Sequence, residues 1–218
     1  MIEPSILSCD FSILGDQIRQ AADAGAKRLH IDVMDGVFVP SISFGMPLIK
    51  SIRKMSDMFF DCHLMIVKPE RYLKVFAGCG ADGITIHAEA CEDIQAAVDE
   101  IHALGKKAGL SIKPGTPVEV LEPYIPSLDL ILVMTVEPGF GCQTFLEGSL
   151  ERIRAVREMI GRIKPDCLLQ IDGGVNTKTI PAARQAGVDI FVSGSAVFYG
   201  ESIADNYRQL TEAEKEAE

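Results

Sequence analysis

The chain has 218 residues, of which 47% are hydrophobic and 24% are charged, the composition of an ordinary globular domain with a sizeable core. Its formal net charge is −10 and no Lys/Arg-rich run offsets it, which argues against nucleic acid as the main partner. No apolar run approaches the length of a membrane span, so no membrane partner is expected. A small anionic substrate is compatible with this acidity, because backbone amides can bind phosphate inside an acidic protein.

The cysteines indicate a reducing compartment. The chain has six cysteines, which are scattered and include no C-x-x-C pair, and this spacing favours neither a zinc cluster nor a disulfide framework. The first residues lack the basic and apolar regions of a signal peptide. We therefore expect a cytoplasmic protein with free thiols.

Strands and helices are predicted to alternate along the whole chain. Strands are expected at 2–8, 28–33, 61–66, 83–87, 107–113, 129–136, 168–172 and 189–193. Helices are expected at 11–24, 46–55, 69–77, 92–104, 117–124, 145–163, 177–186 and from 202. Pro123 and Pro126 indicate that the helix at 117–124 is short or broken.

This alternation predicts the fold class. Eight strand-helix units with short connections imply parallel strands, right-handed crossovers and an α/β fold that closes into an eight-stranded (β/α)8 barrel. We expect one barrel domain at 1–210 and an acidic C-terminal tail at 211–218.

Two of the predicted strands repeat an unusual pattern. Side chains alternate faces along a strand, so His30 and Asp32 share one face of the second strand. Asp61 and His63 share one face of the third strand, and each pair is followed by a methionine. A His and a carboxylate on each of two strands predict a metal site or an acid/base centre.

Other ionisable residues have plainer interpretations. We interpret Asp35 as a turn residue, and His87 and His102 as hydrogen-bonded core histidines. Asp61 lies deeper in its strand than His63, so whether it orients a ligand from behind is left open.

Three glycine-bearing loops follow the last predicted strands. They contain Gly139 to Gly141, Gly173-Gly174 and Gly194-Ser195. Glycines in such loops can simply make tight turns, but three together at one end of a barrel favour phosphate binding by backbone amides.

Six segments together resemble the ribulose-phosphate 3-epimerase family. In chain order they are residues 4–8 (PSILS), 30–40 (HIDVMDGVFVP), 61–65 (DCHLM), 138–141 (PGFG), 172–174 (DGG) and 194–195 (GS). The H-x-D-x-M-D-G-x-F-V-P run is the most specific of them. The resemblance implies a TIM barrel of the ribulose-phosphate-binding type and an isomerase of carbohydrate metabolism, in the pentose phosphate pathway.

The resemblance also implies a complete site. One divalent metal ion per subunit (Zn, Fe, Mn or Co) would be held by His30, Asp32, His63 and Asp172, with Asp32 and Asp172 as the catalytic acid/base groups. Substrate would contact Ser8 and His63, and its phosphate would contact Gly139, Phe140, Gly141, Cys142, Gly173, Gly174, Gly194 and Ser195. The methionines that would line the metal side of the cavity are Met34, Met65 and Met134.

The implied reaction is epimerisation at C3 of a ketopentose phosphate, between D-ribulose 5-phosphate and D-xylulose 5-phosphate. A proton beside the ketone leaves from one face and another returns to the opposite face, which requires one ionised and one protonated carboxyl group. Asp32 and Asp172 lie on strands that are well separated around the ring, so they can straddle a flat intermediate. The enediolate needs a Lewis acid on its oxygens, which is the role implied for the metal.

Departures from the family pattern leave the length of the sugar open. Cys142 stands where a further glycine is usual, and a positive φ at this residue would be strained. Glu137 opens the same loop with an acidic residue, and Lys113-Pro114 stands where the family often has Asn-Pro.

The alternatives are a 3-epimerase of a ketohexose 6-phosphate such as allulose 6-phosphate, and a non-catalytic sugar-phosphate sensor. A barrel lyase of the orotidine-phosphate decarboxylase type generally relies on a lysine beside its carboxylates, and no Lys has an inward position near Asp32. Family members are usually oligomeric, so a homo-oligomer is expected.

Overall fold

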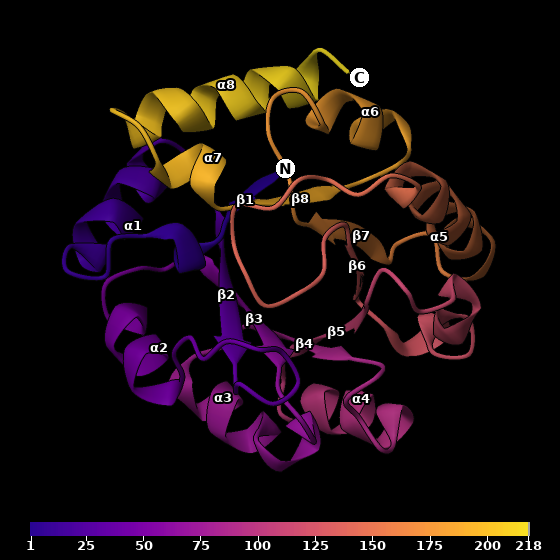
Figure 1. The fold of residues 1–218 in the computed structure, drawn as a ribbon. Coiled ribbons are helices and arrows are strands. Elements are labelled where there is room, and N and C mark those ends of the chain that lie inside the picture. The colour runs from indigo at the N-terminus through magenta and orange to yellow at the C-terminus, as the bar shows by residue number, and fades with distance from the viewer. Residues whose placement is uncertain (218) are drawn as a thin grey trace.

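Eight parallel strands form a barrel that is ringed by helices in the computed structural model, which describes residues 1–217 (Figure 1). The strands are β1 (Ile2–Pro4), β2 (Arg28–Met34), β3 (Phe59–Met65), β4 (Gly83–His87), β5 (Lys107–Ile112), β6 (Leu130–Met134), β7 (Leu168–Asp172) and β8 (Ile190–Ser193). Their order is β1-β8-β7-β6-β5-β4-β3-β2, and a parallel bridge from Ser5 to His30 joins the first strand region to β2. The predicted eight-stranded α/β barrel is confirmed.

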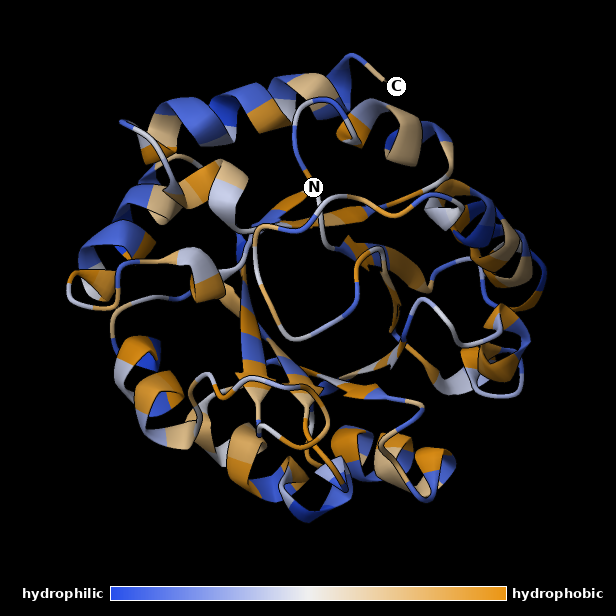
Figure 2. Ribbon diagram, viewed as in Figure 1, coloured by the Kyte–Doolittle hydropathy of each residue, from blue (hydrophilic) through white to orange (hydrophobic). Residues whose placement is uncertain are grey.

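The helices cover the outside of the barrel. They are α1 (Leu14–Asp23), α2 (Met46–Arg53), α3 (Leu73–Cys79), α4 (Ile94–Ala103), α5 (Ser149–Ile163), α6 (Ile180–Gln185), α7 (Ser195–Phe198) and α8 (Ile203–Lys215). Each longer helix buries an apolar stripe against the sheet, as α1 does with Leu14, Ile18 and Ala21. Figure 2 shows this pattern as orange on the strands and on the inward sides of the helices, with blue mainly outside.

Two observed elements differ from the predicted ones, and prolines account for the first difference. The expected helix at 117–124 is replaced by two 3-10 turns, Val118–Leu121 and Ile125–Ser127, because Pro123 and Pro126 supply no amide hydrogen for an α-helical ladder. The first strand ends at Pro4 rather than at residue 8, and after it Ser5 still donates its amide hydrogen to the carbonyl of Ser193 at 3.0 Å. Residues 6–8 then form a 3-10 turn, so Ser8 lies in a turn and not on a strand.

The expected tail overlaps the last helix. Helix α8 continues to Lys215, and Glu214 in its last turn accepts a hydrogen bond from the amino group of Met1. That amino group also donates to the carbonyl of Asp189, at 2.7 Å. Residues 211–215 are therefore part of the outer helical layer, and residue 218 of the expected tail lies outside the described residues. Over residues 1–217, no helix combines the length and the apolar character that crossing a membrane would require.

Candidate active site

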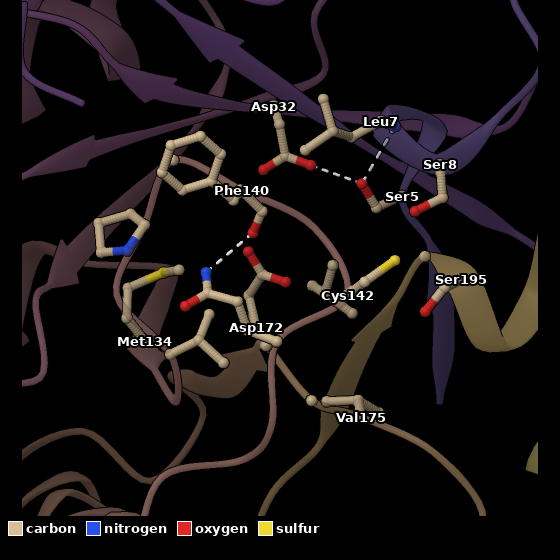
Figure 3. A pocket seen from close by; sticks show the side chains of 18 of the residues that line it. Ser5, Leu7, Ser8, Asp32, Met134, Phe140, Cys142, Asp172, Val175 and Ser195 are labelled. Atoms are coloured by element: carbon tan, nitrogen blue, oxygen red, sulfur yellow. Dashed lines mark hydrogen bonds between the residues drawn. The ribbon is translucent and has the colours of Figure 1, made fainter. Parts of the chain in front are cut away.

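A cavity of about 390 Å³ opens at the carboxyl ends of the strands, where barrels of this kind place their chemistry. Side chains of β2, β3, β6 and β7 reach it, and the loops after β6, β7 and β8 form its rim. Asp32 and Asp172 point toward one another in Figure 3, with Ser8, Cys142 and Ser195 further along the same cavity. The loop after β6 crosses the barrel opening in Figure 1.

The residues implied as metal ligands come together beside this cavity. One ligand atom from each of the four lies within 4.8 Å of the others, from His30, Asp32, His63 and Asp172. The Nε2 atom of His30 is 3.2 Å from Nδ1 of His63 and 3.3 Å from Oδ1 of Asp32. The remaining side of this triangle, from His63 Nδ1 to Asp32 Oδ1, is 3.3 Å.

This spacing fits a divalent transition metal. Ligand bonds of about 2.0–2.1 Å in tetrahedral geometry separate neighbouring ligand atoms by about 3.3 Å. Two imidazoles with carboxylates suit zinc, iron, manganese or cobalt better than calcium, which takes all-oxygen sites. The donor set and its spacing therefore fit a resident divalent ion.

Strand register explains why these side chains meet. In the parallel pair of β2 and β3, Asp32 is the partner of His63, and Met34 is the partner of Met65. Residues at the same level of a barrel that share the alternation point to the same interior layer. The repeated His/Asp pattern of the sequence thus becomes one cluster instead of two.

Asp61 lies behind His30 and orients it. The Nδ1 atom of His30 is 3.3 Å from Asp61 Oδ2, so this histidine directs Nε2 toward the ligand cluster. Asp61 also accepts hydrogen bonds from Thr85 (3.1 Å) and from Gln170 (2.9 Å). The sequence left open whether Asp61 orients a ligand residue. In the structure its carboxylate contacts Nδ1 of His30, the nitrogen that does not face the ligand cluster.

Below this level a buried polar layer closes the barrel interior. Gln170 Nε2 donates to Glu3 at 2.7 Å, and Arg28 Nε donates to the same carboxylate oxygen at 3.1 Å. The other oxygen of Glu3 has no hydrogen-bond partner among the described residues. Burial raises the pKa of Glu3 to about 7, against the opposing charge of Arg28.

Ser5 belongs to the site and was missed by sequence reasoning. Its hydroxyl donates to Asp32 Oδ2 at 2.5 Å and accepts a hydrogen bond from the amide of Leu7. Ser5 lies in the resemblance segment at 4–8, but only the early end of β1 turns it toward Asp32. The sequence feature that could have identified Ser5 as a site residue is its position directly after Pro4, the last residue of β1.

The pKa values of the two aspartates, Asp32 and Asp172, are shifted in opposite directions. Burial disfavours the charge of Asp32, but the charges and hydrogen bonds of His30 and His63 outweigh this and lower its pKa. Burial raises the pKa of Asp172 to about 7, and the neighbouring charge of Asp32 acts in the same direction. Near neutral pH the metal-free cavity therefore holds one ionised carboxyl group, that of Asp32, and one that is protonated in part, that of Asp172.

The loops on the opposite side of the cavity offer backbone groups. Positive φ angles occur at Gly139 (125°), Gly173 (116°) and Gly174 (65°), and also at Cys142 (60°). A Cβ at Gly174 would lie 2.3 Å from the backbone nitrogen of Phe145, so only glycine fits there. The strain expected at Cys142 is present, because φ is in the left-handed region that a cysteine adopts at a cost.

Most residues implied as substrate contacts line the cavity. Eight of them do so: Ser8, Gly139, Phe140, Cys142, Gly173, Gly174, Gly194 and Ser195. Met34, Met65 and Met134 line it too, and all three are buried. Gly141 and His63 are not among the lining residues, and His63 is fully buried. Contact of each residue with substrate stays a prediction.

Comparisons with known proteins identify the family of the chain. The model of the family described as "Ribulose-phosphate 3 epimerase family" matches residues 1–198. The chain belongs to the ribulose-phosphate 3-epimerase family. Its relatives include the Mycobacterium tuberculosis protein named ribulose-phosphate 3-epimerase, 48% identical over 198 residues, which are 91% of this chain and 86% of that protein. The protein of the same name from Bacillus subtilis is 46% identical over 202 residues, covering 92% of this chain and 93% of that one.

Solved structures support the fold of this ribulose-phosphate 3-epimerase family member. The Streptococcus mutans protein named KGPDC matches with a TM-score of 0.77 at 14% identity, over 99% of this chain and 97% of that one. The 3-keto-L-gulonate-6-phosphate decarboxylase of Vibrio cholerae matches with a TM-score of 0.76 at 14% identity, over 100% and 98% of the two chains. At these identities the likeness concerns the barrel alone. Membership of the epimerase family makes the chain an isomerase.

Proposed function

We propose that the chain epimerises C3 of a ketopentose phosphate, interconverting D-ribulose 5-phosphate and D-xylulose 5-phosphate with a bound divalent metal. The observation that carries this proposal is the pair of carboxyl groups, Asp32 and Asp172, that face one another across one cavity beside two histidines. The names of the relatives, ribulose-phosphate 3-epimerase, support the choice of substrate.

The proton steps follow from the two carboxyl groups. The ionised carboxylate of Asp32 takes the proton from C3, which is acidic because it lies beside the C2 ketone. The protonated carboxyl of Asp172 then delivers a proton to the opposite face of C3, which inverts that centre. In the reverse reaction the two groups exchange roles. Ser5 holds Asp32 in place through its hydroxyl hydrogen bond.

Metal binding is proposed at His30, Asp32, His63 and Asp172, whose ligand atoms cluster beside the cavity. A divalent ion bound there supplies positive charge next to the substrate oxygens and so lowers the cost of removing the C3 proton. The buried methionines of the cavity limit access of water to the carbanionic centre, in our proposal.

Phosphate binding is proposed at the loops after β6, β7 and β8. The lining residues Gly139, Gly173, Gly174 and Gly194 let the backbone approach an anion closely, since no side chain intervenes. Ser195, the first residue of α7, also lines the cavity and adds a hydroxyl group to these backbone groups. In this proposal the phosphate lies at one end of the cavity and C3 lies between the aspartates.

The test is an assay of the purified protein with both candidate sugars, before and after chelation, together with elemental analysis. We expect turnover of ribulose 5-phosphate, its loss on chelation, and recovery on adding one divalent metal. In deuterated water, at low conversion, the xylulose product should carry deuterium at C3 while unreacted ribulose should not. A strong preference for allulose 6-phosphate would overturn the choice of substrate, and binding of both sugars without turnover would indicate a sensor.

The assembly and the compartment are further parts of the proposal. We propose a homo-oligomer, on the strength of the family resemblance, and light scattering of the purified protein tests it. All six cysteines are free in the described residues, which fits a cytoplasmic location.

A further inference from the structure

The second nitrogen of His63 has a partner that metal binding leaves unused. Its Nδ1 atom faces His30 and Asp32, whereas its Nε2 atom lies 2.8 Å from Nε2 of His87. Both histidines are fully buried, so water does not compete for this contact. The two rings are nearly parallel, with an interplanar angle of 27°.

One proton has to lie between these two nitrogens. If His87 donates it, His63 Nε2 is the acceptor, and the neutral His63 then carries its hydrogen on Nδ1. A protonated Nδ1 has no lone pair for a metal. If His63 donates instead, its Nδ1 is free to be a ligand. The tautomer of His87 therefore decides whether His63 can bind a metal.

Glu89 selects the tautomer of His87. One oxygen of this carboxylate is 3.2 Å from Nδ1 of His87, a distance that requires a hydrogen on Nδ1 to avoid repulsion between lone pairs. With that hydrogen on Nδ1, the neutral ring presents Nε2 to His63 as an acceptor. Only the arrangement in which His63 donates satisfies all four ring nitrogens.

Glu89 is itself fixed by the segment after β5. Its other oxygen accepts a hydrogen bond from the amide of Lys113 at 2.7 Å and one from the hydroxyl of Thr116. Arg152 of α5 holds this segment by donating to the carbonyls of Thr116 (2.8 Å) and Lys113 (3.0 Å). Burial opposes the charge of Glu89, but the hydrogen bonds of His87 and Thr116 outweigh this and lower its pKa to about 2. The carboxylate therefore stays an acceptor over the physiological range.

We propose that His87 and Glu89 are positioning residues for the metal: Glu89 sets the tautomer of His87, and His87 sets the tautomer of His63 so that Nδ1 remains a ligand. This inference rests on the proposed metal site. It differs from the support of His30, where a carboxylate, Asp61, contacts the ligand directly. Partners behind metal ligands fix both ring orientation and basicity, and their removal typically weakens metal binding about 10- to 100-fold.

The plainer interpretation is that His87 only fills space in the core. Its ring lies 4.8 Å from that of Phe38, centroid to centroid, and an aromatic ring of similar size would serve packing equally well. His87→Phe separates the two interpretations, because it keeps a ring and removes the acceptor. His87→Gln keeps an acceptor oxygen and should restore part of the metal affinity.

The experiment measures the dissociation constant for Co²⁺ by competition with a chromophoric chelator, and the visible absorption of the cobalt form. We expect His87→Phe and Glu89→Ala to weaken cobalt binding by about 10- to 100-fold, with an altered spectrum, and His87→Gln to fall between them and the parent. His102→Gln is the matched control, since His102 pairs with Asp129 at 2.8 Å on the outside of the barrel. It should leave cobalt binding unchanged.

The outcomes separate this inference from the proposal beneath it. Parental cobalt affinity in both His87→Phe and Glu89→Ala would overturn the inference while the metal site stands. Absence of cobalt binding in the parent, or parental binding in Asp32→Asn, would overturn the metal site itself. Thermal unfolding of the metal-free variants checks their fold, and Glu89→Ala decides the question if His87→Phe does not fold, because Glu89 is partly exposed at the rim.

Discussion

The two sides of the active-site cavity are built in different ways. On the side of β2 and β3, side chains from regular strands converge, and each has a defined hydrogen-bond partner, as His30 has in Asp61. On the side of the loops after β6, β7 and β8, the backbone itself faces the cavity, and positive φ angles at Gly139, Gly173 and Gly174 shape it. In the proposed function, strands therefore carry the side chains that react, and main-chain amides of the loops bind the phosphate.

The first prediction removes the functional group of Asp172, the last residue of β7, and has the largest expected effect. Asp172→Asn should lower turnover by about 10³-fold or more, because an amide cannot exchange a proton with C3. The metal-free protein should fold as before, since burial raises the pKa of the replaced carboxyl to about 7 and the amide of Asn has nearly the same shape. Steady-state kinetics and thermal unfolding measure the two effects.

The control for that variant is Asp166→Asn, an exposed acid in the loop before the same strand. It should leave turnover unchanged. Parental activity in Asp172→Asn would remove this residue from the mechanism.

A second prediction concerns the polar layer that supports the strand side. The pKa of Glu3 is raised from 4.5 to about 7 by burial, so the native state holds this proton more tightly than the unfolded chain does. Stability from this group is complete below pH 4.5 and is lost as pH rises to about 7. Glu3→Gln removes that loss, so the variant should gain about 3 kcal/mol relative to the parent between about pH 4 and about pH 7.5.

Urea unfolding of the metal-free proteins across this pH range measures the change, with Glu158→Gln on the exposed side of α5 as the control. Parallel pH profiles for Glu3→Gln and the parent would mean that Glu3 is ionised in the native state without cost.

A third prediction strains the backbone on the loop side. In Gly174→Ala the new Cβ would meet the backbone of Phe145, and φ of 65° is unfavourable for alanine. We expect a cost of about 2 kcal/mol, seen as a rise in KM of about 30-fold. Cobalt affinity should not change, because three of the four proposed ligands belong to the other side and the fourth, Asp172, lies on β7 ahead of the altered turn.

Gly161→Ala is the matched control, because its Cβ would have nothing within 4 Å. It lies within α5, where alanine should add about 0.5–1 kcal/mol of stability without affecting KM. Weakened cobalt binding in Gly174→Ala would show that the two sides are coupled.

The smallest expected effect comes from relieving strain on the loop side. Cys142→Gly replaces the one non-glycine residue of this loop with positive φ, at 60°. Glycine relieves the backbone strain of the folded state but raises the conformational entropy of the unfolded chain, and these two effects oppose one another. We therefore expect a gain in stability of at most about 1 kcal/mol and a small fall in KM. Chemical denaturation and kinetics measure both, and a loss of stability would mean that the thiol contributes contacts worth more than the strain.

The same contrast explains what the sequence could predict. Strand alternation has period 2, so it placed His30 and Asp32 on one face, and register then joined them to His63. The contact between His63 and His87 was not predictable, because β3 and β4 pair His63 with Thr85 and bring the histidines together one level apart. Ser5 was missed because β1 is followed by a 3-10 turn at 6–8, which strand periodicity does not predict.

Cys142 allows the loop side of the cavity to be labelled with thiol-specific reagents. It is the one exposed cysteine in the described chain, whereas Cys62 and Cys167 are buried. A small fluorophore attached to this thiol would sit at the rim of the cavity and would report ligand occupancy without a coupled assay. Inorganic phosphate bound in the cavity would protect this thiol from an alkylating reagent. The protected fraction of the thiol would then give the fraction of occupied sites.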